Sequence, residues 1–170
     1  MSLIIRKMTM EDISAVIDLD QKSFSLPWPE RSFRFELTDN PASRCWLAEL
    51  DGKVVAMIVV WLIADEAHVA TLATHPDFRR QGIGKRLLSH ALLSLFQEGA
   101  RSSFLEVRKS NLAAQTMYRN FGYEVTGRRP RYYRDNDEDA ILMNLDSLSV
   151  ERLRFDGEPS VLDTEEHNER

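Results

Sequence analysis

A short loop rich in glycine and arginine carries the clearest chemical signal in the chain. The run is Arg79-Arg80-Gln81-Gly82-Ile83-Gly84, between an expected strand and an expected helix. Glycines let backbone N–H groups approach a phosphate, and the helix start adds free amides and the positive end of its dipole. The spacing fits neither Gly-x-x-x-x-Gly-Lys nor Gly-x-Gly-x-x-Gly. Two interpretations stay open: a phosphate cradle, or a helix start that only needs glycines.

Three ordered segments around this loop resemble the GNAT superfamily of N-acetyltransferases. Residues 68–88 resemble its acetyl-CoA motif, in which Arg/Gln-x-x-Gly-x-Gly/Ala stands between a strand and a helix. Further matches lie at 105–123 and at 131–143, and the first of these resembles the RimI-type branch, which acetylates protein N-termini, and its archaeal relatives. Together the matches cover most of residues 1–146. The resemblance implies direct attack of an amine on the thioester of acetyl-CoA, without an acyl-enzyme.

The resemblance also implies three catalytic side chains. Glu106 matches the base that removes a proton from the attacking amine, often through water, and an apolar cleft would raise its pKa. Tyr118 matches the acid that protonates the departing thiolate. His68 matches a position beside the base and would extend a proton relay. The structural alternatives are a salt-bridged glutamate, a core tyrosine and a structural histidine.

Acetyl-CoA would be held by the glycine loop and the strand before it. The resemblance places backbone contacts to pantetheine and to the thioester carbonyl at Leu72, Ala73 and Thr74. The family usually has a plain aliphatic residue at position 74, but a backbone contact survives that change. Asn111 caps a helix in one interpretation and also touches the cofactor in the other. The full expected cofactor set is Leu72, Ala73, Thr74, Arg79, Arg80, Gln81, Gly82, Ile83, Gly84, Lys85, Asn111 and Tyr118.

Two aromatic segments would clamp the acceptor. In RimI-type enzymes the loop between the first two helices and the loop between the last two strands hold a peptide N-terminus. Aromatic rings there hold a peptide backbone by stacking and by hydroxyl hydrogen bonds. The alternative for the first segment is a hydrophobic staple between loop and core. The expected substrate-binding residues are Phe24, Leu26, Trp28, Glu30, Tyr132 and Tyr133.

Metal chemistry is not expected. His75, His90 and His167 lack metal-ligand spacing, and the acidic run 135–139 resembles a solvated turn. The single cysteine, Cys45, lies in an apolar strand and is expected in the core. One cysteine also excludes an internal disulfide framework.

Hydrophobic periodicity and turn signals place these residues on alternating elements. A helix is expected after Thr9, ending before Pro27, and Asp51-Gly52 marks a hairpin turn. The remaining expected helices are 30–37, 84–96 and 112–121, and the expected strands are 3–6, 45–50, 54–62, 68–74, 104–109, 123–128 and 140–145. This order predicts a single α/β domain with a mostly antiparallel mixed sheet flanked by helices. The resemblance adds a splay after the acetyl-CoA-binding strand.

Composition and charge limit the domain organisation and the classes of partner. The 170 residues carry 22 Lys+Arg and 27 Asp+Glu, and the net charge of −5 comes entirely from 156–170. We therefore expect a domain at 1–148 and an acidic, disordered tail at 149–170. The neutral domain argues against a nucleic-acid surface, whereas the local basic cluster suits a phosphate-bearing cofactor. No apolar run reaches the roughly 18–20 residues of a membrane span, and no secretory signal is present, so we expect a cytoplasmic protein.

These observations predict an acetyl-CoA-dependent N-acetyltransferase that acts on protein or peptide N-terminal α-amines, for example of a ribosomal protein. One alternative is a small-molecule or lysine side-chain acetyltransferase on the same scaffold. Another, of a different class, is a non-catalytic acyl-CoA sensor that binds partners through its acidic tail.

Overall fold

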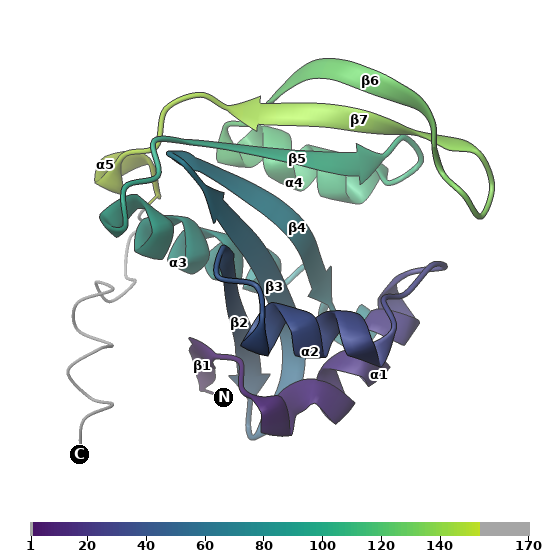
Figure 1. Ribbon diagram of the computed structural model, residues 1–170, viewed down its shortest axis with the longest axis vertical. Coiled ribbons are helices and arrows are strands. Elements are labelled where there is room, and N and C mark those ends of the chain that lie inside the picture. Colours follow the sequence, from purple (N-terminus) through teal and green to yellow (C-terminus); the bar gives the residue numbers. More distant parts are fainter. Residues whose placement is uncertain (1, 154–170) are drawn as a thin grey trace.

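A seven-stranded sheet forms the centre of the computed structural model, which describes residues 2–153 (Figure 1). The strand order is β1-β2-β3-β4-β5-β7-β6, and every neighbouring pair is antiparallel except β4 and β5, which are parallel. The predicted α/β class with a mostly antiparallel mixed sheet is confirmed. The strands are β1 Leu3–Lys7, β2 Ser43–Leu50, β3 Lys53–Ile63, β4 Glu66–Thr74, β5 Ser102–Arg108, β6 Glu124–Tyr133 and β7 Glu138–Leu145.

The helices follow the predicted order, and α4 has the predicted bounds. None of the helices within residues 2–153 has the length and apolar character to cross a membrane. The helices are α1 Ile13–Ser23, α2 Glu30–Thr38, α3 Ile83–Gln97, α4 Leu112–Phe121 and α5 Val150–Leu153, with short 3-10 turns η1 Met10–Asp12 and η2 Pro76–Phe78.

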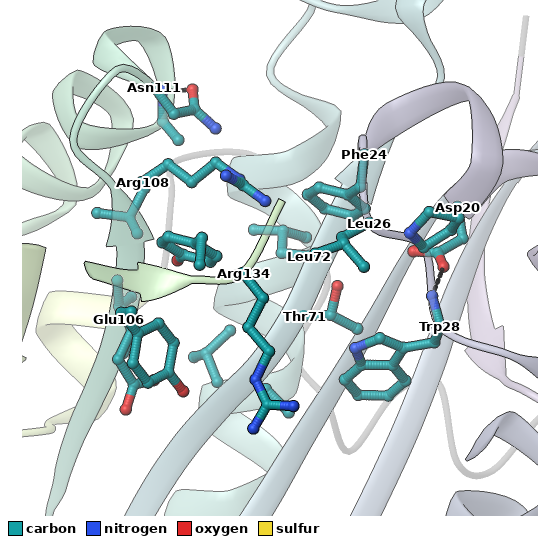
Figure 2. A pocket seen from close by; sticks show the side chains of 18 of the residues that line it. Asp20, Phe24, Leu26, Trp28, Thr71, Leu72, Glu106, Arg108, Asn111 and Arg134 are labelled. Carbon is teal, nitrogen blue, oxygen red and sulfur yellow. Dashed lines mark hydrogen bonds between the residues drawn. The ribbon is translucent and has the colours of Figure 1, made fainter. Parts of the chain in front are cut away.

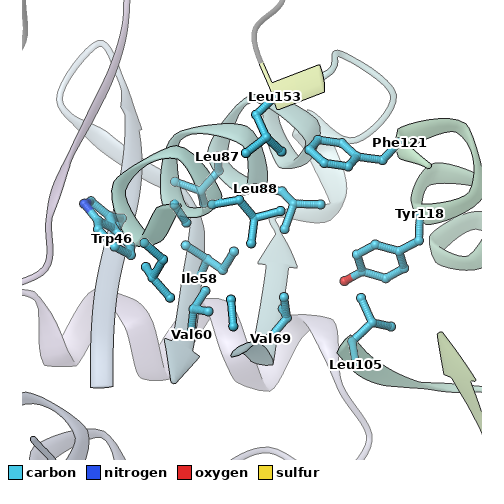
Figure 3. Packing of buried hydrophobic residues seen from close by; sticks show 14 of the residues in the cluster. Trp46, Ile58, Val60, Val69, Leu87, Leu88, Leu105, Tyr118, Phe121 and Leu153 are labelled. Atoms are coloured by element: carbon cyan, nitrogen blue, oxygen red, sulfur yellow. The ribbon is translucent and has the colours of Figure 1, made fainter. Parts of the chain in front are cut away.

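Strand β3 shows how the helices cover both faces of the sheet. Its residues alternate between two apolar clusters, as the two-residue period of a strand requires. Ile58 and Val60 belong to the cluster under α3, together with Leu88 of that helix (Figure 3). Met57 and Val59 belong to the other cluster, under α1 and α2. A strand buried on both faces explains why 54–62 is an almost continuous apolar run.

The parallel pair β4–β5 opens into a splay. Pairing runs from Glu66 opposite Ser102 to Val69 opposite Leu105 and then ends, although both strands continue. Ala70 is an extra residue against β3, because Val59 pairs with Thr71 and Val60 with Val69. Such a bulge bends its strand. Figure 1 shows β4 and β5 starting side by side and separating toward their carboxyl ends, as the sequence led us to expect.

Strand β6 extends further than expected, to Tyr133 rather than to residue 128. Its ladder with β7 shifts register between Val125 and Gly127, is interrupted after Arg129, and resumes at Tyr133 opposite Glu138. Arg131 has a φ of 52°, which places the irregularity at this point. Tyr132 and Tyr133 therefore lie at the end of a strand rather than in a free loop.

The chain continues its ordered packing past the expected domain end at residue 148. Helix α5 spans Val150–Leu153, and the Leu153 side chain is fully buried in the cluster that contains Leu88 and Phe121 (Figure 3). Ser89 of α3 donates its hydroxyl to the Leu153 carbonyl. The first residues of the expected acidic tail are thus part of the folded domain, and 154–170 lie outside the described residues.

Candidate active site

The splay between β4 and β5 opens a cleft of about 650 Å³ (Figure 2). Strand β4 forms its floor, β5 and α4 one wall, and the α1–α2 segment the opposite wall. The lining residues are Asp20, Phe24, Leu26, Pro27, Trp28, Pro29, Val69, Ala70, Thr71, Leu72, Leu105, Glu106, Val107, Arg108, Asn111, Ala114, Tyr118, Tyr132, Tyr133 and Arg134.

Glu106 and His68 form a close pair at the point where the strands separate. His68 lies opposite Phe104, two residues before Glu106, so the side chains of all three share one face of the sheet. His68 Nε2 lies 2.7 Å from Glu106 Oε2, with both side chains mostly buried. An ionised carboxylate only accepts hydrogen bonds, so the imidazole N–H is the donor.

This pairing reverses the pKa shift expected for Glu106. The hydrogen bond from His68 lowers the pKa of the carboxyl and outweighs the opposing effect of burial, and the charge of Arg129 acts in the same direction as His68. The expectation of a raised pKa, based on an apolar cleft alone, is therefore wrong. Glu106 is held as a carboxylate.

Two aromatic rings fix the imidazole of His68. Phe104 stacks on it with ring centroids 4.3 Å apart and planes 11° apart, and Trp61 meets it edge-on at 5.1 Å. Trp61 is in turn anchored on α2, since its Nε1 donates to Glu36 Oε2 at 2.8 Å. The orientation of His68 thus depends on three different strands and one helix.

Tyr118 occupies the α4 wall of the cleft. The residue is 7% exposed, belongs to the core cluster with Phe121, and packs its ring 5.5 Å from that of Tyr123. Burial raises its pKa above the ordinary value, so the hydroxyl stays protonated. Figure 3 shows its oxygen directed away from α4, toward Leu105. Tyr118 therefore belongs to the core and also lines the cleft, with its hydroxyl protonated.

The glycine loop forms the start of α3. Gly82 is the N-cap residue with a φ of +75°, and a Cβ built there meets nothing within 4 Å. A Cβ on Gly84 would lie 3.2 Å from Thr74 Oγ1, so this glycine lets α3 approach the end of β4. Arg79 Nε donates to the Thr74 carbonyl at 3.1 Å, which holds the loop against the strand. Open space beside free helix-start amides fits a pyrophosphate.

The other expected cofactor residues lie along the same edge. Ala73 and Thr74 complete β4 beyond its pairing with β5, and Leu72 lines the cleft. Asn111 is the N-cap of α4, accepting from the Ala114 N–H at 3.1 Å, and it also lines the cleft. Its capping role, expected from sequence, is confirmed.

The structure brings five of the six expected acceptor-side residues to the cleft. The five are Phe24, Leu26, Trp28, Tyr132 and Tyr133. Glu30 is the exception, because it is the first residue of α2 and its carboxylate pairs with Arg34 at 3.3 Å, one turn along the helix surface. Including Glu30 among the cleft residues is corrected accordingly.

Polar residues that sequence reasoning missed link the two sides of the cleft. Ser25 Oγ donates to Asp135 Oδ2 at 2.5 Å, and the Asp135 carboxylate pairs with Arg108 at 3.0 Å. Arg108 also lies over the Tyr133 ring, 4.0 Å from its centroid. The two-residue period from Glu106 to Arg108 was the available signal, since it places both side chains on one face.

Asp20 of α1 holds the aromatic segment 24–29, which connects α1 to α2, through a hydrogen bond to its backbone. It is 1% exposed and accepts the Trp28 N–H at 2.7 Å (Figure 2). Burial raises the pKa of its carboxyl. The backbone of residues 24–29 is therefore held against the end of α1 by the Asp20 carboxylate.

Cys45 is buried in the cluster under α1 and α2, as expected, and burial raises its pKa to about 11. Within residues 2–153 the structure contains no group of three or more His, Cys, Asp or Glu side chains that could hold a metal ion.

Comparison with known proteins agrees with this geometry. The model of the acetyltransferase (GNAT) family matches residues 13–123. The chain is 34% identical over 145 residues to the [ribosomal protein bS18]-alanine N-acetyltransferase of Escherichia coli (strain K12), covering 79% of this chain and 90% of that protein.

Solved structures give the same result. The crystal structure of the ribosomal-protein-S18-alanine N-acetyltransferase from Escherichia coli superposes with a TM-score of 0.78 at 32% identity, over 91% of this chain and 100% of that one. Ard1 from Thermoplasma volcanium superposes with a TM-score of 0.80 at 26% identity, over 88% of this chain and 100% of that one. The chain therefore belongs to the GNAT family, and it is an acetyl-CoA-dependent N-acetyltransferase.

Proposed function

We propose that the protein acetylates the N-terminal α-amine of a polypeptide, and that its substrate is ribosomal protein bS18 with alanine as first residue. The observation that carries the proposal is the Glu106–His68 pair at the mouth of the β4–β5 splay, between two aromatic-bearing segments. The names of the relatives supply the substrate. A ribosomal-protein substrate implies that the reaction takes place in the cytoplasm.

Acetyl-CoA would be bound along β4 and the start of α3. The pyrophosphate would face the amides that follow Gly82, with Arg79, Arg80, Gln81 and Lys85 around it. The pantetheine chain would pair with the backbone of Leu72 to Thr74, which β5 leaves free beyond Val69. When bound there, acetyl-CoA supplies an activated thioester.

Proton removal from the amine is the first task of the protein. An α-amine has a pKa of ~8, so at neutral pH most of it is protonated and not nucleophilic. Glu106, held ionised by His68, accepts that proton directly or through one water. The amine nitrogen then forms a bond to the thioester carbon, whose oxygen is polarised by β4 amides.

Proton donation to the leaving group is the second task. As the carbon–sulfur bond breaks, the electron pair passes to sulfur, and the Tyr118 hydroxyl donates its proton to the thiolate. Burial keeps that hydroxyl protonated. The nitrogen loses its second proton as the amide forms, and this proton restores the Tyr118 hydroxyl, while Glu106 releases the first proton to solvent. The products are the acetylated chain, the free CoA thiol and one proton.

The bridge between the two sides of the cleft favours a chain end over an internal lysine. The Ser25–Asp135 hydrogen bond joins the α1–α2 segment to the β6–β7 turn. A terminal α-amine brings only one length of polypeptide past this contact. An internal lysine is flanked by backbone on both sides, and both flanks would have to be accommodated.

Release of CoA thiol from acetyl-CoA tests this proposal. Peptides corresponding to the first residues of bS18, with Ala, Ser, Gly or Met in the first position, would be compared at equal concentration. We expect the highest kcat/KM for alanine and no thiol release from the same peptide with its α-amine already acetylated. Equal release from the blocked peptide would contradict the proposal.

A further inference from the structure

A second hollow adjoins the cleft, between α2 and β3. Its volume is about 440 Å³, and we call it the aromatic hollow. Trp28 lines both this hollow and the cleft, so the two share one residue at their border. The residues that line it are Trp28, Arg31, Ser32, Phe35, Glu36 and Trp61. Phe35 is 49% exposed, so its ring is accessible to a ligand in the hollow.

Glu36 gives the aromatic hollow an acceptor and a negative charge. The residue is 7% exposed, and its Oε2 accepts both Trp61 Nε1 at 2.8 Å and Asn40 Nδ2 at 3.0 Å. Its Oε1 has no hydrogen-bond partner within residues 2–153, although every fully buried side-chain oxygen in that part of the chain has one. Oε1 is therefore not fully buried, and an N–H group that enters the hollow can donate to it.

The aromatic hollow lies close to the reacting groups. The Trp61 ring that forms its wall meets the His68 ring at 5.1 Å, and His68 bonds Glu106. All of these side chains lie on the face of the sheet that α1 and α2 cover. A polypeptide whose α-amine reaches Glu106 would cross the hollow after about two or three extended residues, at roughly 3.3 Å each.

We propose that the aromatic hollow binds a basic side chain, arginine or lysine, at the third or fourth residue of the acceptor polypeptide. The proposal rests on the proposed acetylation of a polypeptide α-amine. The three aromatic residues that line the hollow, Trp28, Phe35 and Trp61, would attract a cation, and Glu36 Oε1 would accept its N–H. Arg31 also lines the hollow but is exposed to solvent, where its charge is screened, and Arg34 is paired with Glu30.

The hydrogen bonds of Glu36 make the site preformed. Trp61 is fixed by its indole N–H, and Trp28 is fixed at its backbone by Asp20. A ligand entering the hollow therefore orders few side chains, which favours affinity. Because Trp61 also contacts His68, occupation of the hollow occurs next to the catalytic pair.

A positional scan tests this site. One arginine is moved from position 2 to position 6 of an alanine-led, otherwise neutral peptide, with norleucine as the neutral replacement, and kcat/KM is measured by CoA release. We expect arginine at position 3 or 4 to raise kcat/KM about tenfold over norleucine, through KM. A flat scan, or a preference for glutamate or norleucine at these positions, would overturn the inference.

Variants locate the effect. Glu36→Gln removes the charge but keeps an oxygen for Trp61 Nε1, so the arginine preference should fall to near unity. Phe35→Ala removes an exposed ring and should also reduce the preference, whereas Ile4→Ala, equally exposed but on β1, should not. A full preference in both hollow variants would overturn the site. Failure to acetylate any peptide would overturn the proposed function itself, and acetylation at rates indifferent to positions 3 and 4 would overturn only this inference.

Discussion

At the scale of single residues, the protonation state of Glu106 is set by two opposing effects, burial and the hydrogen bond from His68. Burial alone would raise the pKa of this carboxyl, but the hydrogen bond from His68 lowers it. The group is thus ionised well below neutral pH and ready to accept a proton. In the proposed mechanism, His68 keeps the base Glu106 ionised.

The pH dependence of His68→Ala follows from this balance. Without the hydrogen bond, burial raises the pKa of Glu106, so the acid limb of the kcat/KM profile should move to higher pH than in the wild type. In the wild type, stability from the lowered pKa is present above the unfolded value of ~4.3 and is lost as pH falls through the lower folded value. An unmoved acid limb would contradict this role for His68.

Separate loss of the two proton carriers should have different signatures. Glu106→Gln should lower kcat roughly 10²-fold, the usual share of general base catalysis. Tyr118→Phe should lower kcat with an unchanged peptide KM, since the ring still fills its place beside Tyr123. Steady-state kinetics with acetyl-CoA and an alanine-led peptide would measure both, and wild-type turnover in either variant would contradict that residue's role.

At the scale of elements, local signals predicted much of the structure. Asp51-Gly52 marked the β2–β3 hairpin and Asn111 marked the start of α4, because turn and cap chemistry is encoded in a few adjacent residues. The proposed acetyl-CoA loop rests on the same kind of local signal.

Contacts between distant segments were not predictable from one sequence. Ser25 and Asp135 are 110 residues apart, and their bond depends on how far β6 and β7 extend. The His68–Glu106 bond, across 38 residues, reversed a pKa shift that was argued from burial alone. The first part of β6 was recognised, whereas its continuation past Arg129 lacks periodicity because the ladder is interrupted there.

The conformation of the cofactor loop gives a matched pair of variants. Gly82 and Gly52 both have positive φ, +75° and +81°, with open space where a Cβ would stand. Valine should strain both positions similarly, because β-branched residues avoid this region. Only Gly82→Val should raise KM for acetyl-CoA, by about tenfold or more, since its side chain would occupy phosphate space. Equal acetyl-CoA affinity of the two variants by calorimetry would contradict the phosphate assignment.

At the scale of the whole molecule, the chain after β7 contributes to the core that supports the site. Leu153 is buried beside Leu88 and Phe121, and α3 bonds its carbonyl through Ser89. This packing joins α5 to α3, the helix whose first turn is proposed to bind acetyl-CoA. Helix α5 could not be predicted from the sequence, because its four residues are too few to show a helical period.

Two truncations separate α5 from the acidic segment. Deletion of 149–170 removes Leu153 and should lower Tm by about 5–10 °C, as expected for the loss of a fully buried leucine and its neighbours. Deletion of 156–170 alone should leave Tm and turnover unchanged, since that composition cannot bury a core. Thermal unfolding measures both. Equal Tm values for the two truncations would show that α5 contributes nothing.

Selectivity for the α-amine is the central claim, and competition within one peptide tests it most directly. The peptide carries a free N-terminal alanine and one internal lysine, and after a single incubation with acetyl-CoA the modified nitrogen is located by fragmentation mass spectrometry. Nearly all acetyl groups should lie on the α-nitrogen, because its pKa of ~8 against ~10.4 for lysine leaves more of it unprotonated at neutral pH. The Ser25–Asp135 hydrogen bond across the cleft also favours a chain end, which brings only one flanking chain. Acetylation mainly at the lysine, or faster acetylation of a copy with a blocked N-terminus, would contradict the claim.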